Sequence, residues 1–591
     1  MKIKAPNENG QRLSVPSLDS MDELIALNGR LRKAHDCDIQ GQSLLQLAAE
    51  ARSQLLAAAE HFTRAYCEVV TPLPTTSSTK LTPSTGASCP LIMTGHQPEI
   101  VHPGVWLKNF TAAHLAKSCH GIAIHLIIDS DLGRAPMIRV PTGSSSSPRT
   151  VAIPYDRPTD CIPLEQRPWM DHSAWDTFGA RVHDAISPLI PNTMAQTWWS
   201  QIATPAAAAT TLGLGLARAR HLTEISWQSS FPDKIHRVSQ SLESSQSSST
   251  LELPQSSVCQ LPAFRQFTIH LLSHLPRFHD AYNRALTKYR RIHKIHNHAQ
   301  PVPDLSAENG WLESPYWIWS TQDPTRRALH VRYESNGLRL TDRHHLDQLL
   351  PVTEDGPTDD AMTCLAMWEA NGIKIRTRAL ITTLFARLLL ADLFIHGIGG
   401  AKYDLVTDEI ADQFYGFAPP EFLTLSGTLR LPFNQSSTDP NISGLFDTQK
   451  NSPFFQSTGP GSTGPDSDGQ LQKIAQTIRE FTYHPELHIN LTSINPSERH
   501  TVQKLLQQKQ QWIQTTKTPQ NAAQRHRAIV AANTDLQPWL TNQRKQLDKQ
   551  RISTQLQTAA NHILRSREYA FCLFPADRLQ NFLLDFSSSM T

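Results

Sequence analysis

The chain lacks an excess of charge of either sign. Its 591 residues carry 55 Lys and Arg against 53 Asp and Glu, which gives a formal net charge of only +2. A strongly basic chain would attract nucleic acid or an anionic membrane over its whole surface. The balance therefore predicts no nucleic-acid partner and no membrane partner, and any site for an anion must be local.

Long apolar runs and closely spaced cysteines are also missing. No window approaches the roughly 18 uninterrupted apolar residues of a transmembrane helix, and the N-terminal segment lacks the apolar core of a signal peptide. The eight cysteines are scattered, without a C-x-x-C pair. These absences favour a cytoplasmic protein.

Several catalytic signatures are absent as well. The sequence contains no H-E-x-x-H zinc motif, no Walker loop and no G-x-S-x-G elbow. Six histidines between positions 270 and 298 have no cysteine partner at zinc spacing, so solvated helix ends explain them better than a metal site does. No metal site is predicted.

What the sequence does contain is a succession of segments with different patterns. At this length several packed units are expected, because single cores stop growing at roughly 250–300 residues. The predicted organisation is N-terminal helices in 1–70, a linker at 71–88, a core at 89–432 with a helical insertion at about 172–300, a mobile loop at 239–258, a flexible linker at 433–468, and a helical region at 469–591 that closes with a short element at 567–586.

Strand and helix patterns alternate in the core segment. Predicted strands at 90–94 and 123–129 flank a predicted helix at 104–118, which is the spacing of a βαβ unit in a parallel sheet. Three short alternating segments between 314 and 342 predict an antiparallel meander. We therefore expect an α/β fold with a parallel-sheet core, a helical insertion and a long helical C-terminal region.

The stretch TGHQPEIVHPGVWLK, residues 94–108, joins the first predicted strand to the helix. A helix N-terminus presents free N–H groups and the positive end of the helix dipole, and glycine lets a ligand approach closely. The turn is thus a candidate phosphate-binding or anion-binding device. Its candidate residues are Thr94, Gly95, His96, Gln97, His102, Gly104 and Lys108. The alternative is an ordinary connection between two core elements, in which both histidines are solvated or bonded to the backbone.

Two further clusters fall at the ends of apolar runs. Asp129 and Asp131 follow the second predicted strand, where carboxylates can hold ribose hydroxyls, an amine or Mg²⁺, or can simply cap turns. The Gly-rich segment GIGGAKYD at 397–404 allows a tight turn at the start of a helix. Its candidate binding residues are Gly399, Gly400, Lys402, Tyr403 and Asp404.

Both turns resemble segments of one known family. TGHQPEIVHPGVWLK is similar to the T-G-Q-Q segment of the bacillithiol biosynthesis cysteine-adding enzyme family, with His96 in place of a Gln. Residues 375–410 resemble that family's segment in which an R-P-L-x-Q-D-like helix leads to a G-G-P-x-E-x-x-Y turn. The family in turn resembles the nucleotidylyltransferase and class I synthetase group of Rossmann-like folds. In that comparison His102 and Gly104 occupy the first two marked positions of an H-x-G-H-type turn, and Val105 replaces the final His.

The resemblance implies a ligase-like reaction. The family condenses cysteine with the amine of a glucosamine-malate conjugate, which implies a small anionic or phosphorylated substrate at 94–108, with ATP or ADP as the candidate nucleotide. In this scheme Asp129, Asp131 or Asp404 orients the amine. His96 or His102 transfers a proton, since imidazole titrates near neutral pH.

Two other functions stay open at this point. One is a non-catalytic scaffold or binding protein that retains the fold and forms a homodimer through its C-terminal helices. The other is a nucleotidyl or glycosyl transferase on the same fold, which would need a divalent metal.

Overall fold

The computed structural model describes residues 3–69, 89–145, 147–159, 161–230, 247–352, 358–433 and 467–586. The chain divides into two compact units. The first comprises residues 1–142, 151–432 and 567–591, and the second comprises residues 143–150 and 433–566. The predicted linker at 71–88, most of the predicted linker at 433–468 and the first part of the predicted loop, 239–246, lie outside the described residues.

A six-stranded sheet organises the first unit. Its strands are β1 (Arg12–Val15), β3 (Leu91–His96), β4 (Ile122–Ile127), β8 (Thr250–Pro254), β15 (Leu393–His396) and β16 (Phe422–Gly427). They lie in the order β8-β4-β3-β15-β16-β1, and every neighbouring pair is parallel except β16 with the edge strand β1. The predicted parallel pairing of the first two strands is confirmed, because β3 and β4 pair from Leu91–Ile122 to His96–Ile127.

The order of these strands reverses once. The chain proceeds outward from β3 through β4 to β8, and then resumes at β15 on the other side of β3. The segment after β3 therefore leads to β4 on one side, and the segment after β15 leads to β16 on the other side. The Thr94 hydroxyl donates to the Ile395 carbonyl at 3.0 Å and so ties these two strands together.

Strand β8 corrects the prediction of a mobile loop at 239–258. Leu251 and Leu253 are fully buried in the core, whereas Glu252 between them points to the other face of the sheet and pairs with Arg220. The segment TLELP thus has the alternation of a buried strand. The strand has only five residues and follows a run of Ser and Gln, so composition alone did not predict it.

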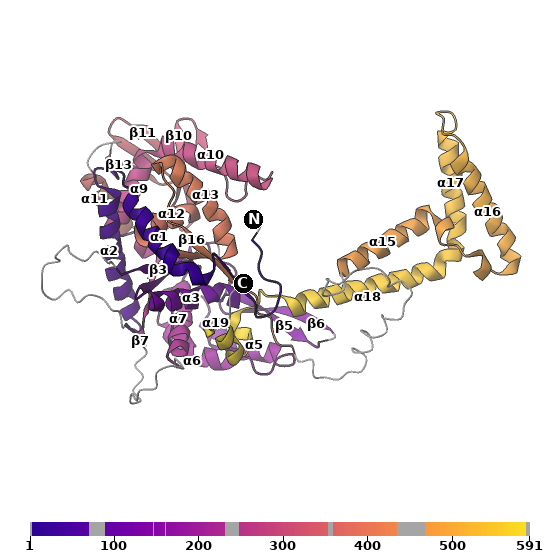
Figure 1. Ribbon diagram of the computed structural model, residues 1–591, viewed down its shortest axis with the longest axis horizontal. Helices are drawn as coiled ribbons and strands as arrows, with labels where there is room; N and C mark the ends of the chain where they lie inside the picture. The colour runs from indigo at the N-terminus through magenta and orange to yellow at the C-terminus, as the bar shows by residue number, and fades with distance from the viewer. Residues whose placement is uncertain are drawn as a thin grey trace. The chain divides into compact units, whose positions relative to one another are not determined.

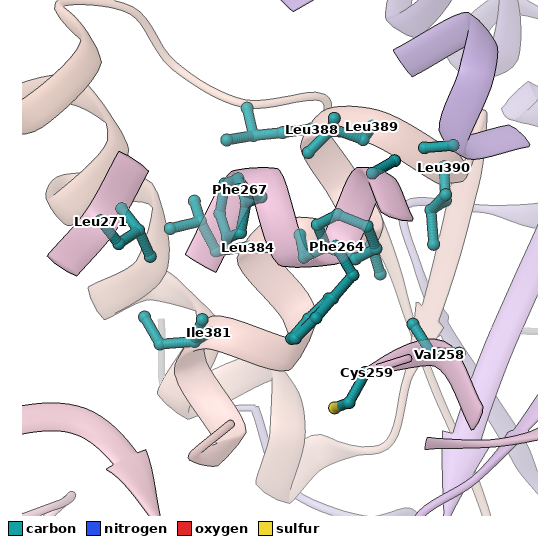
Figure 2. Close-up of a cluster of buried hydrophobic side chains, with 14 of the residues drawn as sticks. Val258, Cys259, Phe264, Phe267, Leu271, Ile381, Leu384, Leu388, Leu389 and Leu390 are labelled. Atoms are coloured by element: carbon teal, nitrogen blue, oxygen red, sulfur yellow. The ribbon is translucent and has the colours of Figure 1, made fainter. Parts of the chain in front are cut away.

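Helices pack against the parallel sheet, and a second sheet contributes to the same core. Figure 2 shows part of the main core, where Phe264 and Phe267 of α9 (Pro262–Ser273) meet Ile381 and Leu384 of α12 (Ala379–Phe385). Helix α2 (Leu44–Arg64) contributes to the same core, and α3 (Pro103–Ser118) packs against β3, β4 and β16. Further helices of this unit are α1 (Met21–Ala34), α5 (Phe178–Ile186), α6 (Ala195–Ala207), α7 (Leu212–Ser230), α10 (Leu275–His293), α11 (Asp359–Ala370) and α13 (Ile398–Tyr415).

The predicted antiparallel meander is confirmed. Strands β10 (Trp311–Ser320), β11 (Arg327–Glu334), β12 (Gly337–Thr341) and β13 (Asp347–Leu350) pair in sequence, and β14 (Ile373–Thr377) joins the free side of β10. In Figure 1 these strands lie at the top of the first unit, and α5 and α6 lie at its bottom. Strands β5 (Met137–Gly143) and β6 (Pro148–Pro154) form a separate two-stranded sheet.

The last described residues belong to the first unit. Helix α19 (Ala576–Leu584) packs against α3. The Phe571 amide donates to the Val101 carbonyl at 2.9 Å, and its ring lies 4.1 Å from the Trp106 ring. This closing element therefore covers the start of α3.

The second unit is helical. It contains α15 (Ser467–Tyr483), α16 (Pro496–Gln514), α17 (Ala522–Leu536) and α18 (Thr541–Arg565), with a small core around Ile494, Val502 and Leu536. The chain is thus a mixed α/β protein with a mostly parallel sheet and a helical C-terminal region. Among the described residues, none of the helices combines the length and apolar character needed to cross a membrane.

Candidate functional site

The two turns that carry the family resemblance follow neighbouring strands of the sheet. Strand β3 ends at His96 and β15 ends at His396, and Thr94 pairs with Ile395 one position before the end of β15. The strand order reverses between β3 and β15, and open α/β sheets bind ligands outside the carboxyl ends of their strands at such a point. Turns far apart in the sequence therefore meet where a ligand site is expected.

The N-terminus of α13 is open at this edge. Gly397 is the N-cap and makes no side-chain capping bond. A Cβ atom added at Gly397 or at Gly399 would meet no atom within 4 Å, whereas one at Gly400 would lie 2.8 Å from Nδ1 of His396. Glycine therefore leaves the first-turn N–H groups accessible to an anion and makes room for the imidazole beside them.

His396 and Asp404 form a buried pair next to that helix start. His396 Nε2 lies 2.9 Å from Asp404 Oδ2, and the two residues are 5% and 1% exposed. Because the carboxylate holds the Nε2 proton, Nδ1 keeps a free lone pair. Nδ1 has no hydrogen-bond partner in the described part of the chain and lies beside Gly400. Nδ1 is therefore available to accept a hydrogen bond.

Two other groups keep Asp404 charged. Its carboxylate accepts from the Thr383 hydroxyl at 2.5 Å and from Arg387 at 2.6 Å. Burial raises the pKa of Asp404, but Arg387 and His396 more than offset that effect, so its pKa lies below the usual value. The carboxylate therefore stays ionised beside the His396 ring.

Sequence reasoning missed His396, although it named Lys402 and Tyr403 on the helix that follows. His396 ends an apolar strand, where a histidine resembles an ordinary core residue. Its position eight residues before an acid on the following helix was the available clue. Lys402 and Tyr403 are exposed on α13, away from the buried His396–Asp404 pair.

The turn after β3 is held from within. Nζ of Lys108 donates to the Gly95 carbonyl at 2.9 Å, and Lys108 is buried. Burial, helped by Arg220, lowers the pKa of Lys108 to about 8. Lys108 therefore fixes the turn from within.

His96 is a buried, neutral side chain. Its Nδ1 donates to the Gln97 carbonyl at 2.8 Å, and its ring lies 4.4 Å from the ring of His125. Burial, with His125 and Arg220 nearby, holds the pKa of His96 well below its usual range. His96 is therefore bonded to the backbone, as in the alternative that treats the turn as an ordinary connection.

His102 and Gly104 serve the start of α3. Nδ1 of His102 accepts from the Gly104 amide at 3.1 Å and so caps the helix. A Cβ at Gly104 would lie 2.3 Å from the Gly427 carbonyl oxygen, so this glycine permits close packing against β16. Burial lowers the pKa of His102 to about 4. Of the two helix starts that the sequence predicted as candidates, that of α13 is open to an anion, and that of α3 is closed by this packing.

The two aspartates play different parts. Asp131 is accessible, accepts from the Gln97 amide nitrogen at 2.8 Å and pairs with Arg326 at 2.8 Å, so it links three loops at the sheet edge. Asp129 is 2% exposed and accepts from the amide and the hydroxyl of Ser256. Burial and the nearby Glu165 raise the pKa of Asp129 to about 7. Asp129 thus has the turn-capping role, and Gln97 and Asp131 form the accessible rim.

The described residues contain no metal-binding cluster, and the two cavities lie away from the predicted site residues. Among the described residues, no group of three or more His, Cys, Asp or Glu side chains is arranged to hold a metal ion. One small cavity is lined by Cys259 and its neighbours, and a larger one by Tyr66, Arg218, Glu252 and others. Neither cavity is lined by a residue that the sequence predicted for the site.

The chain matches no protein-family model and no curated protein.

Proposed function

We propose that this chain is a ligase-like enzyme on a Rossmann-like core and a distant relative of the bacillithiol biosynthesis cysteine-adding enzyme family. In this proposal it joins a small amino acid to an amine on a small anionic substrate. The observation that carries the proposal is the pairing of β3 with β15, which brings both family-like turns to the point of strand reversal.

The α13 N-terminus would bind the anionic group. The first-turn amides of α13 and the positive end of its dipole favour a carboxylate or phosphate. ATP and ADP are the first nucleotides to test for this reason. Gln97 and Asp131, at the accessible rim, are placed to orient an amine by hydrogen bonding.

His396 would be the proton acceptor. The amine attacks an amino-acid carboxyl carbon that ATP activates as a mixed anhydride with phosphate. The C–N bond forms as the C–O bond to the phosphate group breaks, and the amine loses a proton that an imidazole held by a carboxylate is suited to take. Asp404 fixes the tautomer of His396 and stabilises its charged form. This role replaces the one that the sequence gave to His96 and His102, which are occupied by the fold.

A variant pair tests the anion site directly. Gly399→Glu places a carboxylate in open space at the start of α13, where the helix dipole favours it and where it repels an anionic ligand. Gly29→Glu is the matched control, because Gly29 lies within α1 and a Cβ atom added there would also meet nothing within 4 Å.

Thermal-shift titrations of the full chain with ATP, ADP, cysteine and glucosamine phosphate give the readout. Stabilisation that grows with ligand concentration in the wild type and in Gly29→Glu, and that is lost in Gly399→Glu, supports the proposal. Flat responses of the wild type to every ligand favour the scaffold function. An undiminished response of Gly399→Glu removes the anion site from α13.

A further inference from the structure

A cavity of about 170 Å³ lies beside β8, the edge strand of the six-stranded sheet. A single water needs roughly 10–15 Å³ of such space, so the cavity admits a molecule much larger than water. Its apolar wall consists of Phe62, Ala208, Ala209 and Leu214. Its polar lining consists of Tyr66, Thr210, Arg218 and Glu252.

The floor of the cavity is a fixed hydrogen-bond network. The Tyr66 hydroxyl lies 2.9 Å from Glu252 Oε2 and 2.7 Å from Nδ1 of His221. Glu252 is fully buried, and Arg220 pairs with its other carboxylate oxygen, Oε1. Because the Glu252 side chain has no exposed surface, it holds the Tyr66 hydroxyl in place and does not itself accept from a ligand.

The backbone around this floor is also held. The Thr63 hydroxyl at the end of α2 accepts from the Glu252 amide at 2.9 Å and donates to the Glu252 carbonyl at 3.3 Å. The loop that supplies Ala208 and Ala209 is fixed by the Trp169 indole, which donates to the Ala209 carbonyl at 3.0 Å. The site is therefore formed before any ligand arrives, which lowers the entropic cost of binding.

Arg218 brings a positive charge to the cavity beside Tyr66. Its guanidinium lies 5.0 Å from the centre of the Tyr66 ring and donates to the Pro205 carbonyl at 3.2 Å. In the described part of the chain no carboxylate lies within ion-pair distance of it. A guanidinium without an acidic partner is suited to bind a carboxylate through its remaining N–H groups.

We infer that this cavity is a second small-molecule site, which binds a short aliphatic carboxylic acid. The carboxylate pairs with Arg218, and a small apolar body lies against Phe62, Ala209 and Leu214. The site is independent of the proposed function, because it shares no residue with the α13 start.

Two compounds of the same carbon skeleton test this assignment. Isothermal titration calorimetry on the full chain compares isovalerate with isovaleramide, which differ in the charge of the group that faces Arg218. Isovalerate should bind at least about tenfold more tightly, since the charged pair with the guanidinium is lost in the amide. Equal affinities for both compounds, or no binding of either, overturn the inference.

Variants locate the binding. Arg218→Met should weaken it about tenfold or more by removing the charge, and Ala208→Phe should weaken it by filling the mouth, where Ala208 lies at the surface and a larger side chain is tolerated. Arg64→Met, an exposed arginine on α2 that does not line the cavity, is the control and should bind as the wild type does. Unchanged affinity in both cavity variants overturns the assignment, and unchanged affinity in Gly399→Glu separates this site from the proposed active site.

Discussion

The buried ion pair of Arg387 and Asp404 makes a quantitative prediction about the proposed active site. The two side chains are 2% and 1% exposed and lie 2.6 Å apart. At an effective dielectric constant near 20, two unit charges at that distance attract by about 6 kcal/mol before the cost of desolvation is subtracted. Removing one partner leaves the other charge buried, which costs about 3–5 kcal/mol.

Arg387→Met and Asp404→Asn should therefore each lower the free energy of unfolding by about 3–5 kcal/mol. The double variant should lose less than the sum, because neither member of this pair is left charged and alone. Arg387 also pairs with Asp408 and donates to the Pro420 carbonyl, and the double variant does not restore those contacts. We therefore expect a coupling energy of about 2–3 kcal/mol, at the upper end of the range for residues in direct contact.

Urea unfolding, monitored by tryptophan fluorescence, measures the free energy of unfolding of the wild type, the two single variants and the double variant. Of the 12 tryptophans, all except Trp512 and Trp539 lie in the first unit, so the fluorescence reports mainly on that unit. The control cycle uses Arg64 and Glu60, a largely exposed pair on α2 that should couple by at most about 1 kcal/mol. If Arg387 and Asp404 couple no more strongly than this control, the carboxylate does not depend on Arg387 for its charge.

Two glycine variants and one pH series test other parts of the structure. Gly104→Ala should lower the melting temperature markedly because its Cβ would lie 2.3 Å from the Gly427 carbonyl oxygen, whereas Gly399→Ala, in open space, should be neutral or stabilising by about 0.4–1 kcal/mol; equal melting temperatures would contradict the close packing of α3. The pKa of Asp129 is raised to about 7 in the folded chain and is about 4 in an unfolded chain, so its stabilising contribution is complete below about pH 4 and is lost as the pH rises through 7. Asp129→Asn should consequently gain stability relative to the wild type between pH 4 and pH 8 in thermal melts, and a constant difference across that range would exclude the raised pKa.

Local patterns predicted the elements whose residues repeat at regular spacing. The parallel pair β3 and β4 followed from two short apolar runs about thirty residues apart with a helix between them. The meander of β10, β11 and β12 followed from alternation alone. In each case the element and its neighbour in space are also neighbours in sequence, so little tertiary information was needed.

The accessible helix start required tertiary information. The turns before α3 and before α13 have the same composition of glycine, a basic residue and a preceding apolar strand. What separates them is the Gly427 carbonyl packed against Gly104, with Phe571 bonded to the backbone nearby, and open space at Gly399. These contacts come from segments hundreds of residues away, so the sequence around each turn does not contain them.

The alternation of side chains along the strands separates the two proposed sites. Ile395 pairs with Thr94, Thr94 with His125, and His125 with Glu252, so these four residues share one face of the sheet. His396 follows Ile395 and therefore faces the other side, because successive residues of a strand point to opposite faces. A ligand at α13 and a ligand beside Glu252 are thus divided by the sheet itself.

This separation predicts that the two sites are energetically independent. With no shared partner, the effects of Gly399→Glu and Arg218→Met on the free energy of unfolding should add within about 0.5 kcal/mol. Urea unfolding of the two single variants and the double variant measures the sum. A larger interaction in the double variant would show that the sheet transmits changes from one face to the other, and the two sites would then have to be treated as coupled.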